Sequence, residues 1–449
     1  MARPDAVSWV GRHPAAARLI GRCLGHLAMV TMVLVALTTV FASPLRFAGY
    51  TSVVLHQRSM SGVDVQMTSV FAETPPETPA VPSTPFPIGI FEDANQMNPV
   101  KFEALVRDIQ GRGFDTVLFT NNQLRVHQPL LDVSDRLGIN VIWAPSYELH
   151  RQWWVDPEPP GIERALDVAG PIVNAIADHP SLIGYNLADE PSLALRDRLA
   201  LIVQAFKQHD PSRLVTAVLI GRDRVPVLYR AAKPDVLLID VYPYGAFNPP
   251  CNVTMSGFGY RMDFTQYVRE VVSPLPRGVP FWTILQTHRF TDSTGPRLRE
   301  PSPTEVRLEH WLAIGEGSQG IFWFIYTSQQ GWRGLRDNPA VFDEVTDLTR
   351  RLSVVRPALA GARRVDDQFS LDDPQELVVT TLERPDASRL AVVVNRSCSE
   401  SREVRLTDGS SRVGFTDLET TAVYDAGTSL LLAPGDGRVL APLAPAASR

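Results

Sequence analysis

The sequence contains few groups suited to binding a metal or carrying redox chemistry. Its 449 residues include three cysteines, Cys23, Cys251 and Cys398, with no Cys-x-x-Cys pair and no other spacing typical of metal ligands. We therefore predict neither a metal nor a cofactor. We expect Cys251 and Cys398 to be free thiols because they fall in different predicted domains, although an oxidising compartment would allow them to pair.

Positive charge is also scarce. The chain has 43 Lys and Arg residues against 49 Asp and Glu residues, which gives a net charge of −6. Nucleic-acid binding needs a basic surface, so this balance argues against nucleic acid as a partner. The sequence also lacks a glycine-rich phosphate loop after any predicted strand, and this absence weakens a nucleotide-binding interpretation.

One long apolar run stands near the amino terminus. Residues 24–42 read LGHLAMVTMVLVALTTVFA and follow four arginines. This layout is typical of a signal peptide, and the run of 19 residues is also close to the ~20 that cross a bilayer as a helix. We predict that residues 1–43 are a signal peptide or membrane anchor. The rest of the chain is then secreted, or held on the extracytoplasmic side with no other membrane contact.

The remainder divides into three predicted parts. Residues 44–85 form a linker, because the segment TPPETPAVPSTPFP at 74–87 is rich in Pro, Thr and Ser. Residues 86–360 alternate short apolar strands with helical patterns. Residues 361–449 show strand patterns separated by turns and no convincing helix, which predicts a small β-sandwich.

Eight strand–helix units fill the middle part. The predicted strands lie at 88–91, 116–120, 140–145, 182–187, 215–220, 236–241, 281–286 and 320–326. They are continuous apolar runs, as expected of parallel strands that are buried on both faces. Eight such units in about 265 residues match a (β/α)8 TIM barrel within the α/β class better than an open sheet. Active sites of such barrels form at the carboxyl ends of the strands.

The fourth predicted strand ends in an acidic pair followed by proline, Asp189-Glu190-Pro191. Here the sequence resembles the clan of retaining (β/α)8 glycoside hydrolases, whose fourth strand ends Asn-Glu-Pro. The resemblance extends over residues 86–352, and includes HPSLIGY at 179–185, DVYPY at 240–244 and GSQGI at 317–321. It implies a carbohydrate-binding site with Glu190 as the catalytic acid/base. That task requires a raised pKa, to which an ionised Asp189 would contribute by repulsion.

The sequence departs from the clan at two positions. Asp189 stands where the clan has asparagine, and Gln286 stands at the seventh strand end, where the clan has its nucleophilic glutamate. Asp240 at the end of the sixth strand is one replacement: a nucleophile at about 5 Å from Glu190, or an inverting base at about 6.5–9.5 Å. Alternatively, Asp189 and Glu190 act as a substrate-assisted pair, or the site binds sugar without cleaving it. Glu92 and Glu148 are reserve carboxylates.

Aromatic and polar side chains also fall near the predicted strand ends, where aromatic rings could pack against the apolar faces of sugars. The aromatic residues are Trp143, Trp153, Trp154, Tyr185, Tyr242, Tyr244, Trp282, Trp323, Tyr326 and Trp332. The polar residues are Asn121, Asn122, Gln286, His288 and Arg289. Among these we predict substrate contacts for Asn121, Trp143, Tyr185, Tyr242, Tyr244, Gln286, His288, Trp323 and Tyr326.

The resemblance therefore implies an exported or membrane-anchored glycoside hydrolase that cleaves glycosidic bonds in a polysaccharide or glycoconjugate. The predicted catalytic residues are Glu190, Asp240 and Asp189. The alternative is a carbohydrate-binding scaffold on a degenerate barrel, because the usual seventh-strand carboxylate is missing. The fold alone does not decide between them.

Overall fold

A computed structural model describes residues 86–443, apart from 94–97, 121–126, 256–261, 373 and 375. The predicted signal or anchor segment and the linker lie outside the described residues. All of the described residues belong to one compact unit. No helix in the described part of the chain is both long enough and apolar enough to cross a membrane.

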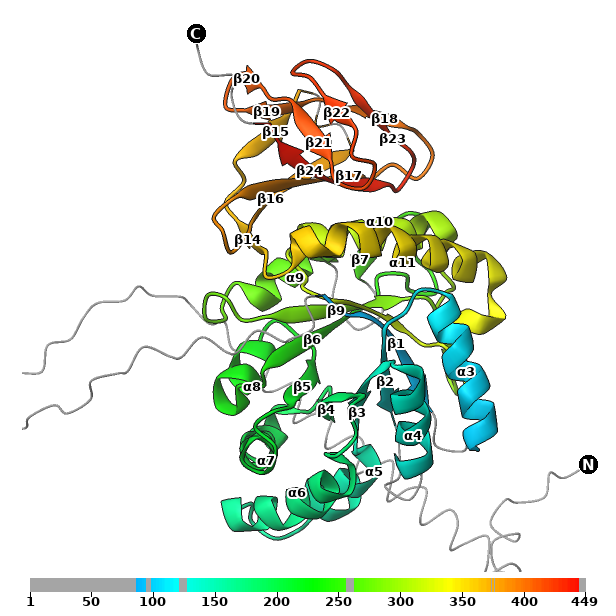
Figure 1. Cartoon of the computed structure of the whole chain (residues 1–449), viewed down its shortest axis with the longest axis vertical. Helices are drawn as coiled ribbons and strands as arrows, with labels where there is room; N and C mark the ends of the chain where they lie inside the picture. The colour runs from blue at the N-terminus through cyan, green and yellow to red at the C-terminus, as the bar shows by residue number, and fades with distance from the viewer. Residues whose placement is uncertain are drawn as a thin grey trace, which may run out of the picture. The chain divides into compact units, whose positions relative to one another are not determined.

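Eight parallel strands close into a barrel, as predicted from the sequence (Figure 1). Around the ring the order is β1-β12-β9-β6-β5-β4-β3-β2. The strands are β1 (Ile88–Asp93), β2 (Thr116–Thr120), β3 (Asn140–Trp143), β4 (Leu182–Asp189), β5 (Leu214–Leu219), β6 (Val236–Val241), β9 (Phe281–Gln286) and β12 (Ile321–Phe324).

Helices cover the outside of this barrel. The main ones are α3 (Pro99–Gly111), α4 (His127–Leu137), α6 (Ile162–Ile176), α7 (Arg196–His209), α8 (Val225–Ala232), α9 (Phe264–Val272), α10 (Pro303–Gly315) and α11 (Pro339–Leu359). Short-range hydrogen bonds fix two helix starts: Asn98 caps α3, and Ser302 and Glu305 form a capping box on α10. Shorter elements are α5 (Ser146–Leu149), the π-helix η2 (His150–Trp154), and the 3-10 helices η3 (Leu193–Leu195) and η4 (Leu335–Asp337).

Side chains fill the barrel interior, so the lumen is a packed core. Trp282 on β9 stacks on Phe322 of β12, with ring centroids 5.5 Å apart. Gly89 on β1 makes room for Phe322, because a Cβ at this position would lie 2.2 Å from the phenyl ring. Phe91, Ile284 and Leu238 belong to the same buried cluster. Because these apolar side chains fill the interior, the carboxyl ends of the strands are the place where polar groups can converge.

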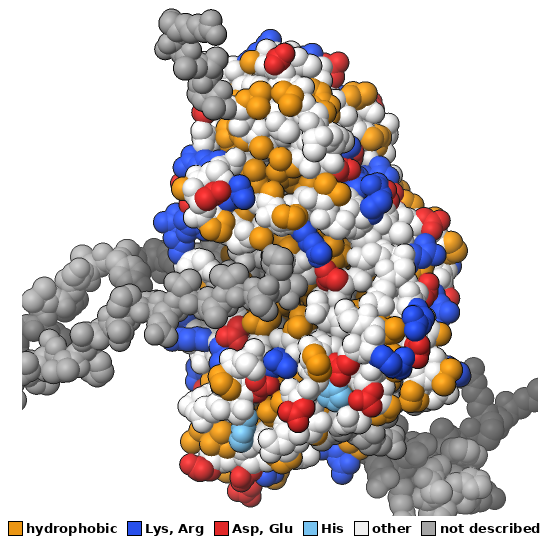
Figure 2. Space-filling model, viewed as in Figure 1, with side chains coloured by type: hydrophobic (Ala, Val, Ile, Leu, Met, Phe, Trp, Pro, Cys, Tyr) orange, Lys and Arg blue, Asp and Glu red, His pale blue; other side chains and the backbone are white. Residues whose placement is uncertain are grey.

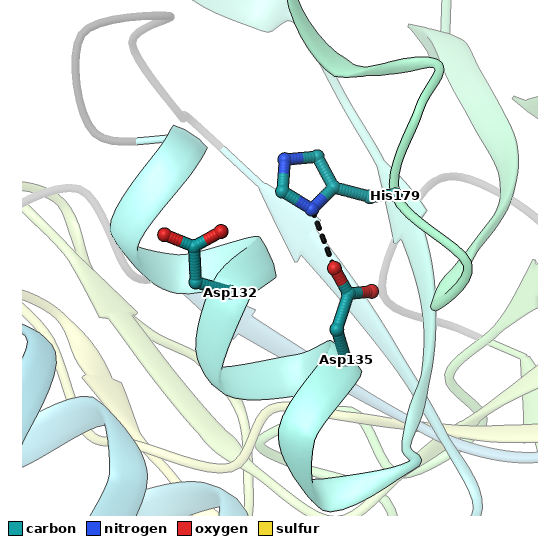
Figure 3. Close-up of side chains that lie close together, drawn as sticks. All are labelled: Asp132, Asp135 and His179. Carbon is teal, nitrogen blue, oxygen red and sulfur yellow. Dashed lines mark hydrogen bonds and ion pairs between the residues drawn. The ribbon is translucent and has the colours of Figure 1, made fainter.

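A hydrogen-bonded clamp fixes the start of β4. Asp135 near the end of α4 accepts from the backbone N–H of Ser181 at 2.8 Å, and its other oxygen lies 2.6 Å from Nδ1 of His179 (Figure 3). His179 and Ser181 are both buried. The clamp therefore sets the register from which β4 runs towards Glu190.

The C-terminal strands form three antiparallel sheets, ordered β14-β16-β17-β24-β21-β22, β15-β19-β20 and β18-β23. Along β17, Ala391 and Val393 join a core shared by these sheets, whereas Val392 points to the other side and lies near Gly315 of α10. The strands are β14 (Arg363–Val365), β15 (Phe369–Leu371), β16 (Leu377–Glu383), β17 (Arg389–Asn395), β18 (Arg402–Val404), β19 (Leu406–Asp408), β20 (Ser411–Arg412), β21 (Phe415–Asp417), β22 (Val423–Tyr424), β23 (Leu430–Leu432) and β24 (Gly437–Pro442).

Two small sheets in the barrel loops were not predicted. One pairs β10 (Arg289–Asp292) with β11 (Gly295–Leu298) and β13 (Trp332–Arg333), and the other pairs β7 (Thr254–Met255) with β8 (Met262–Asp263). In the first, Trp332 stacks on Phe290 with ring centroids 3.9 Å apart. Strands of two to four residues are too short to show a periodic pattern.

Ion pairs join the barrel helices to the C-terminal sheets. Arg351 of α11 is buried and donates to Glu419 at 2.9 Å and to Asp436 at 2.8 Å. A buried arginine requires such partners, because an unpaired charge would be costly to remove from water. At the surface, Lys and Arg side chains are interspersed with Asp and Glu on the face shown in Figure 2.

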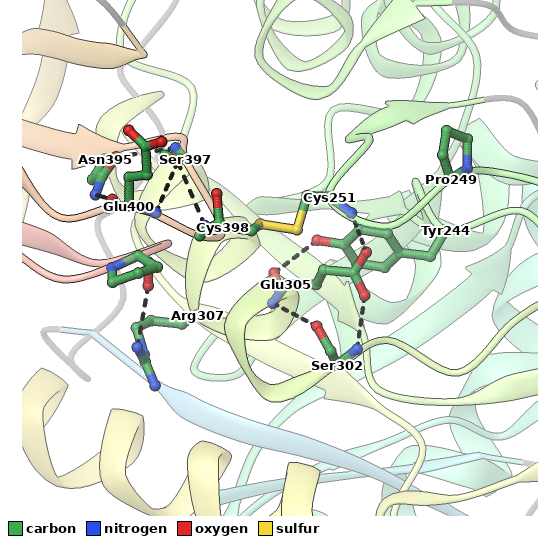
Figure 4. The surroundings of a disulfide bond; sticks show 12 residues. Tyr244, Pro249, Cys251, Ser302, Glu305, Arg307, Asn395, Ser397, Cys398 and Glu400 are labelled. Atoms are coloured by element: carbon green, nitrogen blue, oxygen red, sulfur yellow. Dashed lines mark hydrogen bonds between the residues drawn. A yellow bond between two sulfur atoms is a disulfide. The ribbon is translucent and has the colours of Figure 1, made fainter.

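A disulfide also joins the two regions, and our expectation of free thiols is therefore wrong. Cys251, in the loop after β6, is bonded to Cys398, in the turn after β17, with a Cα–Cα distance of 6.0 Å (Figure 4). The backbone N–H of Cys251 donates to Glu305 at 2.7 Å, and Glu305 pairs with Arg299. The sequence gives no distance between Cys251 and Cys398, which are 147 residues apart in the chain.

Because this bond closes a span of 147 residues, its loss should destabilise the protein. We predict that Cys251→Ser or Cys398→Ser lowers the free energy of unfolding by about 2–5 kcal/mol, since the unfolded chain regains entropy. The measurement is urea unfolding with and without reductant. The double variant should have the same free energy of unfolding as either single variant, and reductant should not change it. Equal stability of the oxidised and reduced wild-type protein would contradict the prediction.

Candidate active site

Two consecutive acidic residues at the end of β4 turn towards the barrel axis. In a regular strand, neighbouring side chains point to opposite faces. The pairing of β4 with β5 shifts register between Asn186 and Asp189, and Glu190 has a φ of 46°, a left-handed value that is uncommon outside glycine. The backbone N–H of Glu190 donates to the carbonyl of Val218 at 3.0 Å, which holds this conformation.

Asp240 meets these residues from the inner face of β6. It lies two residues beyond Leu238, which belongs to the barrel interior, and two before Tyr242. The carboxyls of Asp240 and Glu190 lie close together, and the charges of Glu190 and Asp189 both act on Asp240. The Tyr242 hydroxyl donates to Oδ2 of Asp240 at 3.3 Å. The structure thus brings together all three predicted catalytic carboxyls.

Crowding makes these carboxyls weaker acids than usual. Burial raises the pKa of Asp240 well above its ordinary value, and the neighbouring Asp189 and Glu190 charges add to this shift. Burial and the charge of Glu190 raise the pKa of Asp189 to about 6. Asp189 and Glu190 keep solvent-exposed surface, although protein surrounds them on several sides.

The pKa of Glu190 is also raised. Burial is the largest cause, and the hydrogen bond from Asp240 and the positive charge of Arg224 oppose it. Asp240 is the more deeply buried of the two acids, with 6% of its surface exposed. Burial therefore favours the protonated form of Asp240 more strongly than that of Glu190.

His288 supports the Asp240 side of the site. Its Nδ1 lies 2.7 Å from the carbonyl oxygen of Phe324, which can only accept, so Nδ1 carries the proton. Burial lowers the pKa of His288 to about 4, and the ring is therefore neutral. Its ring lies edge-on to Tyr242 with centroids 4.8 Å apart. His288 and Tyr242 thus position Asp240, a role related to the substrate contacts predicted for them.

A cavity of about 470 Å³ opens on the other side of Asp189. The elements that form it are the end of β1, the short α5 and η2 helices after β3, and the end of β4. Its lining residues are Asp93, Ser146, Tyr147, His150, Trp154, Asn186, Leu187, Ala188 and Asp189. Sequence reasoning noted Trp154 but missed Asp93, Ser146, Tyr147 and His150. Their position directly after the first and third predicted strands was the available signal.

Four predicted aromatic contacts lie in the helix layer instead. Trp143 and Trp323 are fully buried in the cluster between strands and helices. The hydroxyl of Tyr185 donates to Asp210 beside α7 at 2.8 Å, and that of Tyr326 donates to Asp108 of α3. These side chains point away from the barrel axis, so we leave them out of the proposed site.

The side chains of Gln286 and Tyr244 form hydrogen bonds that hold the neighbouring loops in place. The side-chain amide of Gln286 donates to the carbonyls of Tyr244, His288 and Arg299 at 3.3, 3.3 and 3.0 Å. Its Oε1 accepts from the N–H of Tyr244 at 2.9 Å. The hydroxyl of Tyr244 donates to the Glu305 carbonyl at 2.7 Å. Both residues are fully buried. Asn121, the last predicted contact, lies outside the described residues.

The reserve carboxylates lie apart from the three acids. Glu92 is buried, accepts from the N–H of Thr327 at 3.0 Å, and has its pKa raised to about 8 by burial. Its neighbours in β1 show that it faces outward, since Phe91 belongs to the barrel interior. Glu148 is buried on α5. Neither lies within hydrogen-bonding distance of the Glu190–Asp240 pair in the described contacts.

One group of side chains has a spacing compatible with a metal. The ligand atoms of Asp132, Asp135 and His179 lie within 4.8 Å of one another. However, the Asp135 carboxylate is already bonded to His179 and Ser181, and the group lies at the amino end of β4. We assign it the clamping role described above.

The closed barrel with carboxyls at its strand ends is the architecture of (β/α)8 glycoside hydrolases. The chain superposes on a glycoside hydrolase family 5 structure from Bacteroides vulgatus ATCC 8482 with a TM-score of 0.53, 11% identity, and coverage of 80% of this chain and 89% of that one. A second structure, described as a glycoside hydrolase, gives a TM-score of 0.53, 11% identity, and coverage of 80% and 92%. At such identities the likeness shows the fold.

Coverage of other structures is partial. The chain spans 60% of the length of a beta-galactosidase from the psychrophilic Marinomonas ef1, with 61% of this chain covered, 12% identity and a TM-score of 0.45. No protein-family model and no curated protein matches the sequence. The chain therefore has the fold of clan-A-like (β/α)8 glycoside hydrolases, as the resemblance implied.

The hydrogen bonds of the Gln286 side chain lead to one prediction. Gln286→Glu would restore the carboxylate that the clan has at this strand end, but would place it among three backbone carbonyls and near Glu309. We predict a loss of stability of about 3–5 kcal/mol, because a buried charge loses its donors, and no gain of turnover. Thermal unfolding of this variant and of the exposed control Gln152→Glu measures the effect. A stable and more active Gln286→Glu protein would refute it.

The raised pKa values of the carboxyls at the ends of β4 and β6 lead to a second prediction. A carboxyl whose pKa is raised by folding favours the fold while protonated, so its contribution is present at low pH and lost as the pH rises through the folded pKa. Wild-type stability should therefore fall as the pH rises above the ordinary carboxyl pKa and through about 6, the raised pKa of Asp189. Asp240→Asn keeps the shape and cannot ionise, so the fall should be shallower. Melting temperatures across this range, with exposed Asp178→Asn as control, provide the measurement. The same dependence of the melting temperature on pH in the wild type and in Asp240→Asn would contradict the prediction.

Proposed function

We propose that the protein is an exported glycoside hydrolase, with Glu190 as proton donor and Asp240 as the second carboxylate. The observation that carries this proposal is the close approach of these two side chains at the carboxyl ends of β4 and β6. Glycoside hydrolysis needs one protonated and one ionised carboxyl beside the scissile bond. A pair that shares a proton supplies both forms.

The close contact favours Asp240 as nucleophile. An inverting enzyme needs about 6.5–9.5 Å between its carboxyls to admit water, whereas a retaining enzyme needs about 5–5.5 Å. As the substrate separates the pair, the shared proton passes to Glu190 and leaves Asp240 ionised. Glu190 then protonates the departing oxygen while Asp240 bonds to the anomeric carbon. Water, deprotonated by Glu190, finally hydrolyses the glycosyl ester and restores both acids.

Tyr242 and His288 prepare Asp240 for this role. The Tyr242 hydroxyl donates to Oδ2 of Asp240, and the neutral His288 ring packs against Tyr242. A donor to one carboxylate oxygen leaves the other free for attack and stabilises the ionised form. His288, which contacts Tyr242, adds no charge, because burial lowers its pKa.

Two observations support export. The apolar run at 24–42 follows a basic segment, as in signal peptides and membrane anchors. The Cys251–Cys398 disulfide suits an oxidising, extracytoplasmic compartment. The substrate is then a polysaccharide or glycoconjugate encountered outside the cytoplasm.

The alternative, a carbohydrate-binding protein without turnover, has one specific observation in its favour. Gln286 replaces the clan nucleophile and its side chain is occupied by backbone groups. If Asp240 cannot approach an anomeric carbon, the same acidic site would bind sugar without cleaving it.

Substitution of the proton donor tests the proposal. Glu190→Gln should reduce turnover of a natural glycan by about 10²–10⁴-fold, because general acid catalysis is lost. The same variant should slow the glycosylation step of aryl glycosides less than that of the natural glycan. The reason is that an acidic phenol needs little protonation in order to leave. Exposed Glu163→Gln is the matched control and should retain wild-type kinetics. Glycan release is followed by chromatography.

Binding measurements separate the two functions. Saturable binding by wild-type protein across a panel of glycans, with no release of product from any of them, would support the binding protein and overturn the hydrolase. Equal turnover by the wild type and Glu190→Gln would remove Glu190 from the mechanism.

A further inference from the structure

One aromatic side chain at the rim of the barrel is almost completely exposed. Phe247, in the loop after β6, has 91% of its surface accessible to solvent, the largest exposed fraction among the large apolar side chains of the described residues. A phenyl ring in water gains none of the stabilisation that burial in a core provides. Core packing therefore does not account for this side chain, and its position favours a role in binding.

The loop that carries Phe247 is fixed on both sides of the ring. The backbone N–H of Ala246 donates to the carbonyl of Arg297 at 3.0 Å. On the other side, Nε of Arg299 donates to the carbonyl of Asn248 at 3.1 Å. Because the backbone is held in this way, little conformational entropy remains to be lost when a ligand packs against the ring.

The same loop extends the small sheet formed by β10, β11 and β13. Gly245 pairs with Leu298 of β11, which pairs with Phe290 of β10. Phe290 in turn pairs with Trp332 of β13. These positions form one row of about 14 Å, because neighbouring strands lie ~4.8 Å apart. Phe247 follows Gly245 by two residues at one end of the row, and the partly exposed rings of Phe290 and Trp332 lie towards the other. We call Phe247, Phe290 and Trp332 the aromatic ridge.

Contacts connect the aromatic ridge to the proposed catalytic carboxyls. The ring of Trp332 lies against His288 with centroids 4.9 Å apart, and the His288 ring contacts Tyr242 with centroids 4.8 Å apart. The Tyr242 hydroxyl donates to Asp240 at 3.3 Å. A polymer bound along the ridge can therefore continue to the acids at which we propose cleavage.

The surroundings of Phe247 suit a sugar chain better than a protein partner. A stable protein interface buries about 800 Å² on each partner around an apolar centre. In the described part of the chain, the next exposed large apolar side chains along the sequence, Val227 and Val354, belong to the outer helices α8 and α11. Polar groups lie closer, because Arg297 forms a partly exposed ion pair with Asp292 at 2.7 Å. A ring beside polar groups matches a sugar, which presents apolar C–H faces and hydroxyls together.

We propose that the aromatic ridge binds a segment of a neutral polysaccharide next to the sugar that is cleaved, so that the protein prefers polymers to short glycosides. This inference rests on the proposed function and deepens it, because it assigns the length of the substrate. Phe247 packs against the apolar face of one sugar ring, and the exposed edges of Phe290 and Trp332 contact rings closer to Asp240. These contacts require no charge on the ligand.

Substitution of Phe247 tests the aromatic ridge. Trp332 is less suitable, because it also touches His288. Phe247→Ser is compared with Phe247→Tyr, which keeps the ring, and with Val100→Ser, which changes a side chain on α3 that is 81% exposed. All three are made in the Glu190→Gln background to prevent turnover. The probes for calorimetric titration are the hexasaccharides and disaccharides of mixed-linkage β-glucan, galactomannan, arabinogalactan and dextran.

We expect the Glu190→Gln protein to bind at least one hexasaccharide more tightly than the corresponding disaccharide. Phe247→Ser should weaken binding of this hexasaccharide about fivefold, and binding of the disaccharide less, because one aromatic contact is lost. Phe247→Tyr and Val100→Ser should retain the affinity. The effect of Phe247→Ser should be the same in about 0.5 M NaCl, because salt screens charges and no charge takes part.

Three results of the titration would overturn the inference: no binding of any probe, equal affinity for hexasaccharide and disaccharide, or no effect of Phe247→Ser. Sedimentation measurements provide a fourth. A dimer that dissociates on Phe247→Ser would assign the ring to an interface between two copies of the chain. Thermal unfolding confirms that each variant is folded.

Turnover by the wild-type protein keeps this test separate from the hydrolase proposal. Binding of a hexasaccharide that depends on Phe247, without cleavage of that hexasaccharide or its polymer, would retain the ridge and overturn the hydrolase. Cleavage of a polymer with the same KM in the wild type and in a Phe247→Ser variant that keeps Glu190 would retain the hydrolase and overturn the ridge.

Discussion

The placement of a buried acid, Asp240, next to a second acid, Glu190, is the constraint on which the rest of the site depends. Asp240 and Glu190 can approach within hydrogen-bonding distance only if one of them holds a proton, since two adjacent charges would repel strongly away from water. The barrel enforces this approach by interrupting β4, where a register shift and a left-handed Glu190 bring consecutive side chains to one side. Local backbone irregularity thus brings the acidic side chains together.

Most of the barrel could be predicted because its signals are local. Apolar runs, the Asn98 cap and the Ser302 capping box each depend on residues a few positions apart, and all appear in the structure. The β6 and β9 bounds agree with the predicted strands. The small β10–β11–β13 sheet could not be predicted, because its strands are short and β13 comes from a different loop.

The site was harder to predict because it depends on which face each side chain occupies. Position at a strand end selected Glu190 and Asp240 correctly as neighbours, but it also selected Trp143, Tyr185 and Trp323, which face the helices. Alternation along a strand assigns faces once one residue is fixed. Tyr185 and Leu187 are both in the outer cluster, and the same parity would have excluded Tyr185 beforehand. The shift before Asp189 breaks that parity and has no sequence signature.

The hydrogen bonds of Gln286 suggest why the second carboxylate lies on β6. A side chain that joins the loops after β6 and β9 needs both donors and an acceptor, and an amide provides them whereas a carboxylate does not. Glutamine at this strand end therefore stabilises the wall that carries Tyr244 and His288. The same loop after β6 is tied by Cys251 to the C-terminal sheets. With the wall fixed in this way, Asp240 on the adjacent strand is the carboxylate left facing Glu190.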